Sequence, residues 1–128
     1  MSNLANKPSV ISIRRAYEDP SENDGYRVLV DRLWPRGRSK ESLKLDQWAR
    51  ELAPTDELRK WFGHEPQHWE VFQQRYRSEL AETEKLQQMQ LLLADAAGRS
   101  ITLVYGAKDE QHNQAVVLRD VMSKLLLK

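Results

Sequence analysis

Two short apolar runs limit what this chain can fold into more than any other feature of its 128 residues. RVLVDRL at 27–33 and ITLVY at 101–105 are both flanked by polar or turn-forming residues. Apolar runs this short are typical of strands that are buried on both faces, as in parallel sheets. VISIRRAY at 10–17 is rich in β-branched residues that partly alternate with polar ones, which predicts a further strand.

Several other segments have the apolar spacing and the end signals of helices. In APTDELRKWFG at 53–63, Thr55 is placed to cap a helix, acids occupy its first turn, and Gly63 ends it. An aromatic stripe at helical spacing follows and is interpreted as core packing. Further helices are predicted at 64–82, 85–98 and 110–127.

The segment SKESLKLDQWAREL at 39–52 leaves two alternatives open. Leu45, Trp48 and Leu52 lie at helical spacing, with Ser39 as a cap upstream. The later part can instead form an edge strand that has alternate residues on one side.

Strands separated by helices predict an α/β fold with a mainly parallel sheet of three to four strands flanked by helices. We expect residues 10–128 to form one small domain, because no repeat, low-complexity segment or linker interrupts them. Residues 1–9 are mostly polar and are predicted to form a flexible N-terminal tail.

Charge and cysteine content exclude several classes of function. Twenty basic residues against nineteen acidic ones leave a net charge of +1, which gives no general attraction to nucleic acids or membranes. The chain has no cysteine, which excludes disulfides, thiolate nucleophiles and cysteine-type zinc sites. It begins without a signal-peptide pattern and has no apolar run near the ~18 residues of a membrane span, so we expect a cytoplasmic protein without membrane contact.

No cofactor or metal is predicted. The glycines match neither a dinucleotide-binding fingerprint nor a phosphate-binding loop. His64 and His68 have the spacing of a metal-binding pair on a helix, but Pro66 starts a helix between them, which argues against a shared metal.

Polar residues follow two of the predicted strands, at the position where ligands bind to open α/β sheets. The first cluster contains Asp31, Arg32, Trp34 and Arg36. Arg36 lies between a proline and a glycine, and its guanidinium can bind phosphate or carboxylate through two hydrogen bonds. A structural ion pair with an acid of the middle region is the alternative for Arg36. Asp31 can orient one of the arginines or accept a proton.

The second cluster follows ITLVY and begins with Gly106, which allows an unusual backbone angle. Asp109 is placed to cap the last helix, whose first N–H groups and positive dipole end would form an anion site. Lys108 adds a positive charge, and His112 and Asn113 fall in the predicted first turn. Considered alone, Asp109 is equally well explained as a helix cap without a further role. Lys108 is equally well explained as a solvated lysine that binds no ligand.

Three motifs occur in order along the chain: RVLVDRLWPRGRSK, ELAPTDELRKWFGHEP and YGAKDEQHNQAVVL. Together they resemble the YeaO-like family of small bacterial proteins, a family of unknown function, over nearly the whole chain from about Val10 onward. Thr55 stands where the family usually has serine, which keeps the capping hydroxyl. The resemblance supports the fold and the place of the site, and it implies no particular reaction.

The chain is also similar to a broader group that has VDVRSFPRS after a strand and a later CAEKDPxxCHR stretch. Tyr105 and Asn113 stand where that group has cysteines, so thiol chemistry does not carry over. Val30 stands where the group has its acid, so the comparison does not support a role for Asp31. It also favours a strand near 49–52. The matching residues are Arg32, Pro35, Arg36, Lys108 and Asp109.

Three functions remain open. The favoured one is a site for an anionic small molecule, such as a nucleotide or sugar phosphate, formed where the two clusters meet at one edge of a parallel sheet. A nucleic-acid-associated protein that uses the basic segment 27–44, with Trp34 as a stacking platform, is less favoured. An interaction domain without chemistry is the third. The sequence implies no oligomeric state, and it leaves open whether the protein is an enzyme.

In the favoured case each cluster residue has a role. Ligand binding is assigned to Arg32, Trp34, Arg36, Lys108 and Asn113. Proton transfer is assigned to Asp31, Asp109 and His112.

Overall fold

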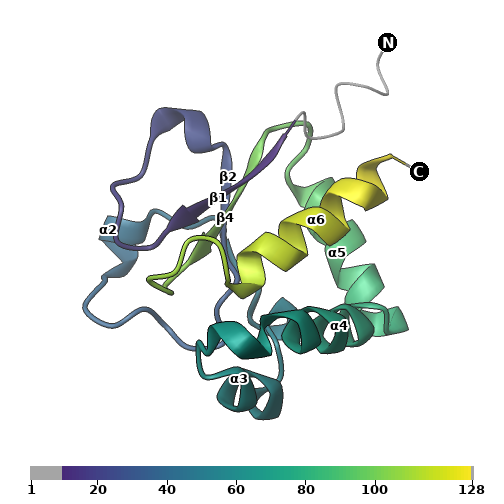
Figure 1. Ribbon diagram of the computed structural model, residues 1–128. Helices are drawn as coiled ribbons and strands as arrows, with labels where there is room; N and C mark the ends of the chain where they lie inside the picture. Colours follow the sequence, from purple (N-terminus) through teal and green to yellow (C-terminus); the bar gives the residue numbers. More distant parts are fainter. Residues whose placement is uncertain (1–9, 128) are drawn as a thin grey trace.

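Within residues 10–127, four parallel strands form one sheet at the centre of the molecule (Figure 1). The computed structural model describes residues 10–127, and the tail predicted at 1–9 lies outside this range. The strands are β1 (Ile11–Arg15), β2 (Tyr26–Leu29), β3 (Gln47–Trp48) and β4 (Ile101–Tyr105), in the order β1-β4-β2-β3. Helices flank this sheet, so the predicted α/β class is confirmed.

The described helices alternate with the strands along the chain. The α-helices are α2 (Lys40–Leu43), α3 (Asp56–Phe62), α4 (Trp69–Leu80), α5 (Thr83–Asp95) and α6 (Gln114–Leu126). Short 3₁₀ turns form η1 (Glu22–Asp24), η2 (Arg50–Leu52) and η3 (Pro66–His68). Among residues 10–127, none of these helices has both the length and the apolar character needed to cross a membrane.

Strand β4 lies between β1 and β2, and all five of its residues are buried. Ile101 pairs with Ile11 of β1, and Leu103 pairs with Val28 of β2. A strand without a polar face buries its side chains only if layers cover both faces of the sheet. Its backbone N–H and C=O groups are all paired only if a strand lies on each side of it. The position of β4 therefore follows directly from its composition.

Successive residues of a strand point to opposite faces, so the sheet packs against two different layers. Val28 and Leu103 belong to the main core, which includes residues of α3, α4, α5 and α6. Leu29 and Val104 belong to a smaller cluster with Leu43 of α2. In Figure 1 the four longer helices lie together on one side of the sheet, and α2 lies on the other.

Helix α3 begins and ends where the sequence predicts. The side-chain oxygen of Thr55 accepts a hydrogen bond from the N–H of Leu58, and Gly63 ends the helix in the left-handed conformation. Phe62 stacks on Phe72 of α4 with ring centroids 4.3 Å apart, which fixes α3 against the helical layer.

The ambiguous segment 39–52 forms neither a single helix nor a long strand. Ser39 caps the short α2, and Lys44 then takes a left-handed conformation that ends it. The chain continues into β3, a two-residue edge strand beside β2. The strand expected near 49–52 is instead the 3₁₀ turn η2. The predicted cap Ser39 is correct, but Leu45, Trp48 and Leu52 lie outside α2, and of these residues only Trp48 lies in the edge strand.

Three predicted boundaries are wrong. Strand β2 ends at Leu29, four residues earlier than predicted, because the chain turns away after Val30 donates its N–H to Val104. The last helix begins at Gln114, because its cap is Asn113 and not Asp109. The helix predicted to end at Gly98 ends at Asp95.

Candidate functional site

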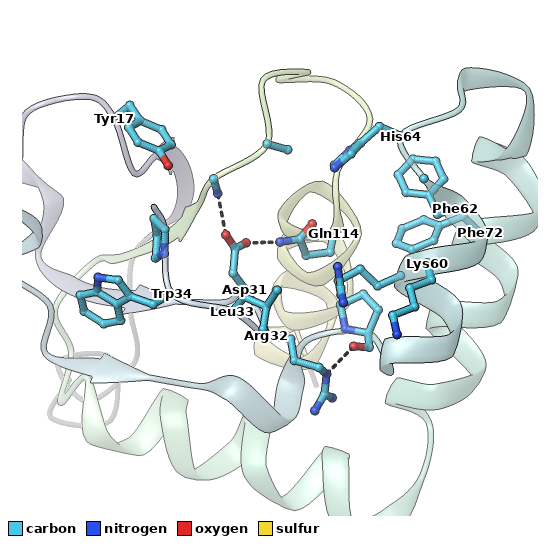
Figure 2. Close-up of a pocket in the computed structure, with 16 residues that line it drawn as sticks. Tyr17, Asp31, Arg32, Leu33, Trp34, Lys60, Phe62, His64, Phe72 and Gln114 are labelled. Carbon is cyan, nitrogen blue, oxygen red and sulfur yellow. Dashed lines mark hydrogen bonds between the residues drawn. The ribbon is translucent and has the colours of Figure 1, made fainter. Parts of the chain in front are cut away.

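The loops that follow β2 and β4 meet at the carboxyl edge of the sheet, because the two strands are parallel neighbours. Asp31 makes the connection. Its Oδ2 accepts a hydrogen bond of 2.9 Å from the backbone N–H of Gly106, and its Oδ1 accepts one from the side-chain amide of Gln114 at the start of α6. Figure 2 shows both bonds.

Gly106 is required here for space and not for backbone angle. Its φ is not positive, contrary to the prediction from the sequence. A Cβ atom at this position would lie 2.9 Å from Oδ2 of Asp31 and 4.0 Å from Cε2 of Tyr17. The absence of a side chain thus lets the carboxylate of Asp31 approach the end of β4, while the ring of Tyr17 lies at ordinary contact distance.

A cavity of about 360 Å³ opens above this carboxylate. Figure 2 shows Asp31 between one wall that carries Tyr17 and Trp34 and another that carries Lys60, Phe62 and His64. The first wall comes from the ends of β1 and β2, and the second from the last turn of α3 and the residues that follow it.

Burial raises the pKa of Asp31 from 3.8 to about 6, although the hydrogen bonds from Gly106 and Gln114 lower it. Desolvation disfavours the charged carboxylate more than two neutral donors can compensate. The group therefore changes its protonation state just below neutral pH, which is unusual for an aspartate.

Arg32 joins the loop after β2 to the segment that precedes α3. Its Nε donates to the carbonyl of Pro54 at 2.8 Å, and one terminal nitrogen donates to the carbonyl of Ala53 at 3.3 Å. These bonds use part of the five-donor capacity of the guanidinium and hold it in the cavity wall. Arg32 is therefore a structural link that keeps its positive charge at the cavity.

Trp34 is held in the opposite wall by its indole N–H, which donates to the carbonyl of Arg38 at 2.6 Å. Its ring contacts Trp48 of β3 edge to face, with centroids 5.4 Å apart. The hydroxyl of Tyr17 donates to the carbonyl of Arg36 at 2.9 Å. Two anchored aromatic rings thus line this side of the cavity.

The wall from α3 is the part of the site that reading the sequence missed. Lys60 is exposed and makes no hydrogen bond or ion pair within residues 10–127, so its charge is available to a ligand. His64 follows the glycine that ends α3 and has a φ of +58°. Arg59 also lines the cavity but is paired with Asp56 at 3.0 Å. In the sequence, this wall is visible only as the cation-rich segment RKWFGH at 59–64. The segment is far along the chain from the two polar clusters, and only the packing of the helices brings it beside them.

The eight residues predicted for the site divide between the cavity and its surroundings. Asp31, Arg32 and Trp34 line the cavity. Arg36 and Lys108 are exposed residues outside the lining, and no hydrogen bond of either side chain occurs within residues 10–127.

The remaining three predicted residues organise the loop before α6. Oδ1 of Asp109 accepts the N–H groups of Gln111 and His112, and its Oδ2 lies 2.9 Å from Nδ1 of His112. These hydrogen bonds, first that from Gln111 and then that from the His112 ring, lower the pKa of Asp109. Asn113 is fully buried and accepts the N–H groups of Ala115 and Val116, so two of the free donors predicted for an anion are already used.

Groups of three or more His, Asp or Glu residues that could hold a metal ion do not occur within residues 10–127. His68 stacks on Trp61 with ring centroids 4.1 Å apart, while His64 lies near Phe62. The two histidines thus have different surroundings.

Comparison with known proteins places the chain among small bacterial relatives. Residues 10–128 match the DUF488-N3i family, described as the inactive DUF488-N3 subclade. The chain is 44% identical over 116 residues to "Uncharacterized protein YeaO" of Escherichia coli (strain K12), which covers 90% of this chain and 98% of the relative. No solved structure matches the chain.

Mycobacterial relatives are more distant. The chain is 35% identical over 114 residues to "Uncharacterized protein Rv3073c" of Mycobacterium tuberculosis and to "Uncharacterized protein Mb3100c" of Mycobacterium bovis. In both comparisons 88% of this chain and 93% of the relative are covered.

Proposed function

The chain belongs to the DUF488-N3i family, and we propose that it binds an anionic small molecule, such as a nucleotide or sugar phosphate, in the cavity at the carboxyl edge of its sheet. The membership confirms the resemblance to YeaO-like proteins seen in the sequence. The family description calls the subclade inactive, which is compatible with a protein that binds a ligand without covalent catalysis.

The charge of the cavity lining is the observation that carries the proposal. Arg32 and Lys60 contribute two positive charges beside the single carboxylate of Asp31, and the charge of Arg59, which also lines the cavity, is offset by its ion pair with Asp56. His64 adds a further charge when it is protonated. Cations around a concave, partly apolar surface raise the local concentration of anions and strengthen their binding.

Size and lining favour a small ligand. The cavity volume of about 360 Å³ is near the lower end of the range for small-molecule sites, roughly 300–1,000 Å³. Aromatic and aliphatic side chains, among them Trp34, Leu33 and Phe62, alternate with the charged groups. Such a mixed lining suits a ligand that has an anionic part and a flat or apolar part.

Covalent catalysis through a thiol is excluded, because the chain has no cysteine. At the two positions where the broader group has cysteines, this chain has a buried tyrosine, Tyr105, and a buried helix cap, Asn113. Of the three residues predicted to transfer protons, Asp31 lines the cavity, and Asp109 and His112 do not. Of these three residues, only Asp31 is therefore placed to exchange a proton with a ligand in the cavity.

Thermal shift measurements at constant ionic strength test the proposal. The panel is inorganic phosphate, ribose 5-phosphate, nucleosides and nucleoside monophosphates, each with the wild type and with the Lys60→Ala and Lys108→Ala variants. A ligand that binds the native state raises the melting temperature by mass action. We expect phosphorylated compounds to raise it in the wild type and in Lys108→Ala, and to have little effect on Lys60→Ala.

Lys40→Ala is the matched control, because Lys40 is an exposed lysine of α2, outside the cavity lining. A shift that is lost in Lys108→Ala but kept in Lys60→Ala would move the anion site to the loop before α6, where the sequence alone had predicted it. If no compound of the panel shifts the wild type, the proposal is wrong and an interaction domain becomes the better explanation.

A further inference from the structure

We infer that the ligand of this cavity is a purine nucleotide whose base presents two adjacent N–H donors, as guanine does, and that Asp31 recognises that edge. The inference rests on the proposed function, which supplies the anionic end of the ligand, and it adds the chemical identity of the other end. Three features of the cavity carry it: its acceptor atoms, the flat wall beside them, and the position of the cations.

The base of the cavity offers acceptors rather than donors. Each carboxylate oxygen of Asp31 already accepts one internal hydrogen bond, from Gly106 or from Gln114. A carboxylate has about four lone-pair sites, so each oxygen can still accept a further bond. Because the amide nitrogen of Gln114 is directed at Asp31, its side-chain oxygen is a third acceptor at this point.

These internal bonds also fix the direction of the acceptors. One donor belongs to the backbone after β4 and the other to the first residue of α6, so the carboxylate is held from two elements. A preorganised acceptor pair discriminates between ligands better than a mobile one, because less conformational entropy is lost on binding.

A flat wall lies beside the acceptors. Cε2 of Tyr17 and Oδ2 of Asp31 both lie within 4.0 Å of the point where a Cβ of Gly106 would be, so the ring and the carboxylate both border the end of β4. The hydroxyl of Tyr17 is bound to the carbonyl of Arg36, and the indole of Trp34 is bound to that of Arg38. Anchored aromatic rings next to hydrogen-bonding groups are the usual means of holding a base.

The free cation lies on the opposite wall. Figure 2 shows Lys60 and His64 across the cavity from Tyr17 and Trp34, with Asp31 between the two walls. A nucleoside monophosphate has the same order of parts, with a flat base at one end and a phosphate at the other. The aromatic wall can therefore contact the base while the cationic wall binds the phosphate of the same ligand.

The acceptor pair selects among bases. Guanine offers the N1–H and the N2 amino group side by side, and a carboxylate can accept both. Adenine offers a donor beside the lone pair of N1, which would face a carboxylate oxygen and be repelled. Hypoxanthine has the N1–H but lacks the amino group, so it should bind with intermediate affinity.

Calorimetric titration at pH 8, where Asp31 is ionised, tests the inference. We expect guanosine monophosphate to bind about 10- to 100-fold more tightly than adenosine monophosphate, with inosine monophosphate between them. Asp31→Asn should remove most of this preference without weakening the binding of ribose 5-phosphate, because the lost carboxylate does not attract the phosphate. Glu110→Gln, which removes an exposed carboxylate of the loop between β4 and α6, should keep the preference.

The outcomes separate this inference from the proposed function. Equal binding of all the monophosphates, or tighter binding of the adenine compound, overturns the inference and leaves the anion site intact. Absence of binding by every phosphorylated compound overturns both. If Asp31→Asn does not fold, Tyr17→Leu provides the second test. It should lower the affinity for guanosine monophosphate at least 10-fold and leave the affinity for ribose 5-phosphate unaffected. An equal loss for both compounds would contradict the inference.

Discussion

The backbone N–H of Gly106 donates a hydrogen bond of 2.9 Å to Oδ2 of Asp31, and this bond joins the loops that follow β4 and β2. The residues are 75 positions apart in the sequence, so the contact exists only after the two strands have paired. The same carboxylate accepts a bond from Gln114 and lines the cavity. One side chain thus connects the sheet, the last helix and the candidate site.

Gly106→Ala should destabilise the protein by about 1–3 kcal/mol, the range in which steric conflicts in packed regions usually fall. The new Cβ would lie 2.9 Å from Oδ2 of Asp31, a distance that forces the carboxylate to move. Urea denaturation measures the free energy of unfolding. The effect should be smaller in an Asp31→Ala background, because the conflicting atom is then absent. Equal effects in both backgrounds would show that the conflict lies elsewhere.

Asp31→Asn should change the pH dependence of stability. The folded-state pKa of Asp31, about 6, lies above its ordinary value of 3.8, so the folded protein binds more protons than the unfolded chain between these pH values. The stability of the wild type should therefore fall, relative to the variant, as pH rises from about 4 to about 6. The shift corresponds to at most about 3 kcal/mol. Denaturation at pH 4 and pH 8 measures it, and a constant difference between the two proteins would rule out the raised pKa.

Asp24→Asn should cost about 3 kcal/mol or more. Asp24 and Arg27 are both buried and form an ion pair at 2.6 Å, so removal of the acid leaves a buried guanidinium without its partner charge. Asp56→Asn is the matched control, because it breaks an exposed pair with Arg59 and should cost much less. Chemical denaturation compares the two variants. Similar losses would mean that the burial of the first pair has no energetic consequence.

Tyr76→Phe should destabilise the protein by about 1–3 kcal/mol. The hydroxyl of the fully buried Tyr76 donates to the carbonyl of Leu52 at 2.6 Å, and the variant leaves that carbonyl without its donor. Tyr17→Phe removes a similar bond at an exposed position, where water can replace the donor, and should cost less than about 0.5 kcal/mol. Melting temperatures of the two variants show the difference. A smaller loss for Tyr76→Phe than for Tyr17→Phe would contradict the argument.

Much of the fold could be predicted because the signals were local. The composition of β4 required a central strand, and Thr55 and Gly63 determined both ends of α3. The start of α6 could not be predicted in this way, because Asp109 and Asn113 are equally suitable caps by residue type. Asp109 uses its side chain for the loop before the helix, so Asn113 caps it.

The candidate site was only half predictable for a similar reason. Asp31, Arg32 and Trp34 follow a strand directly, and the rule about the carboxyl ends of strands locates them. Lys60 and His64 reach the cavity because α3 packs against α4, for example through Phe62 on Phe72. The sequence of neither helix alone predicts a contact between them, so the cations of the wall from α3 were not predicted.

The strand order has a consequence for synthesis of the chain. β1 and β2 do not touch as neighbours; each forms its longest ladder with β4, which lies in the last quarter of the sequence. On the ribosome, translation proceeds from the N-terminus, so the first strands wait without their central partner until residues 101–105 have emerged. Until then only the two-residue pairing of β2 with β3 is available. The sheet therefore cannot be completed before residues 101–105 have emerged, and a ribosome that stalls before β4 would leave β1 and β2 without their central partner.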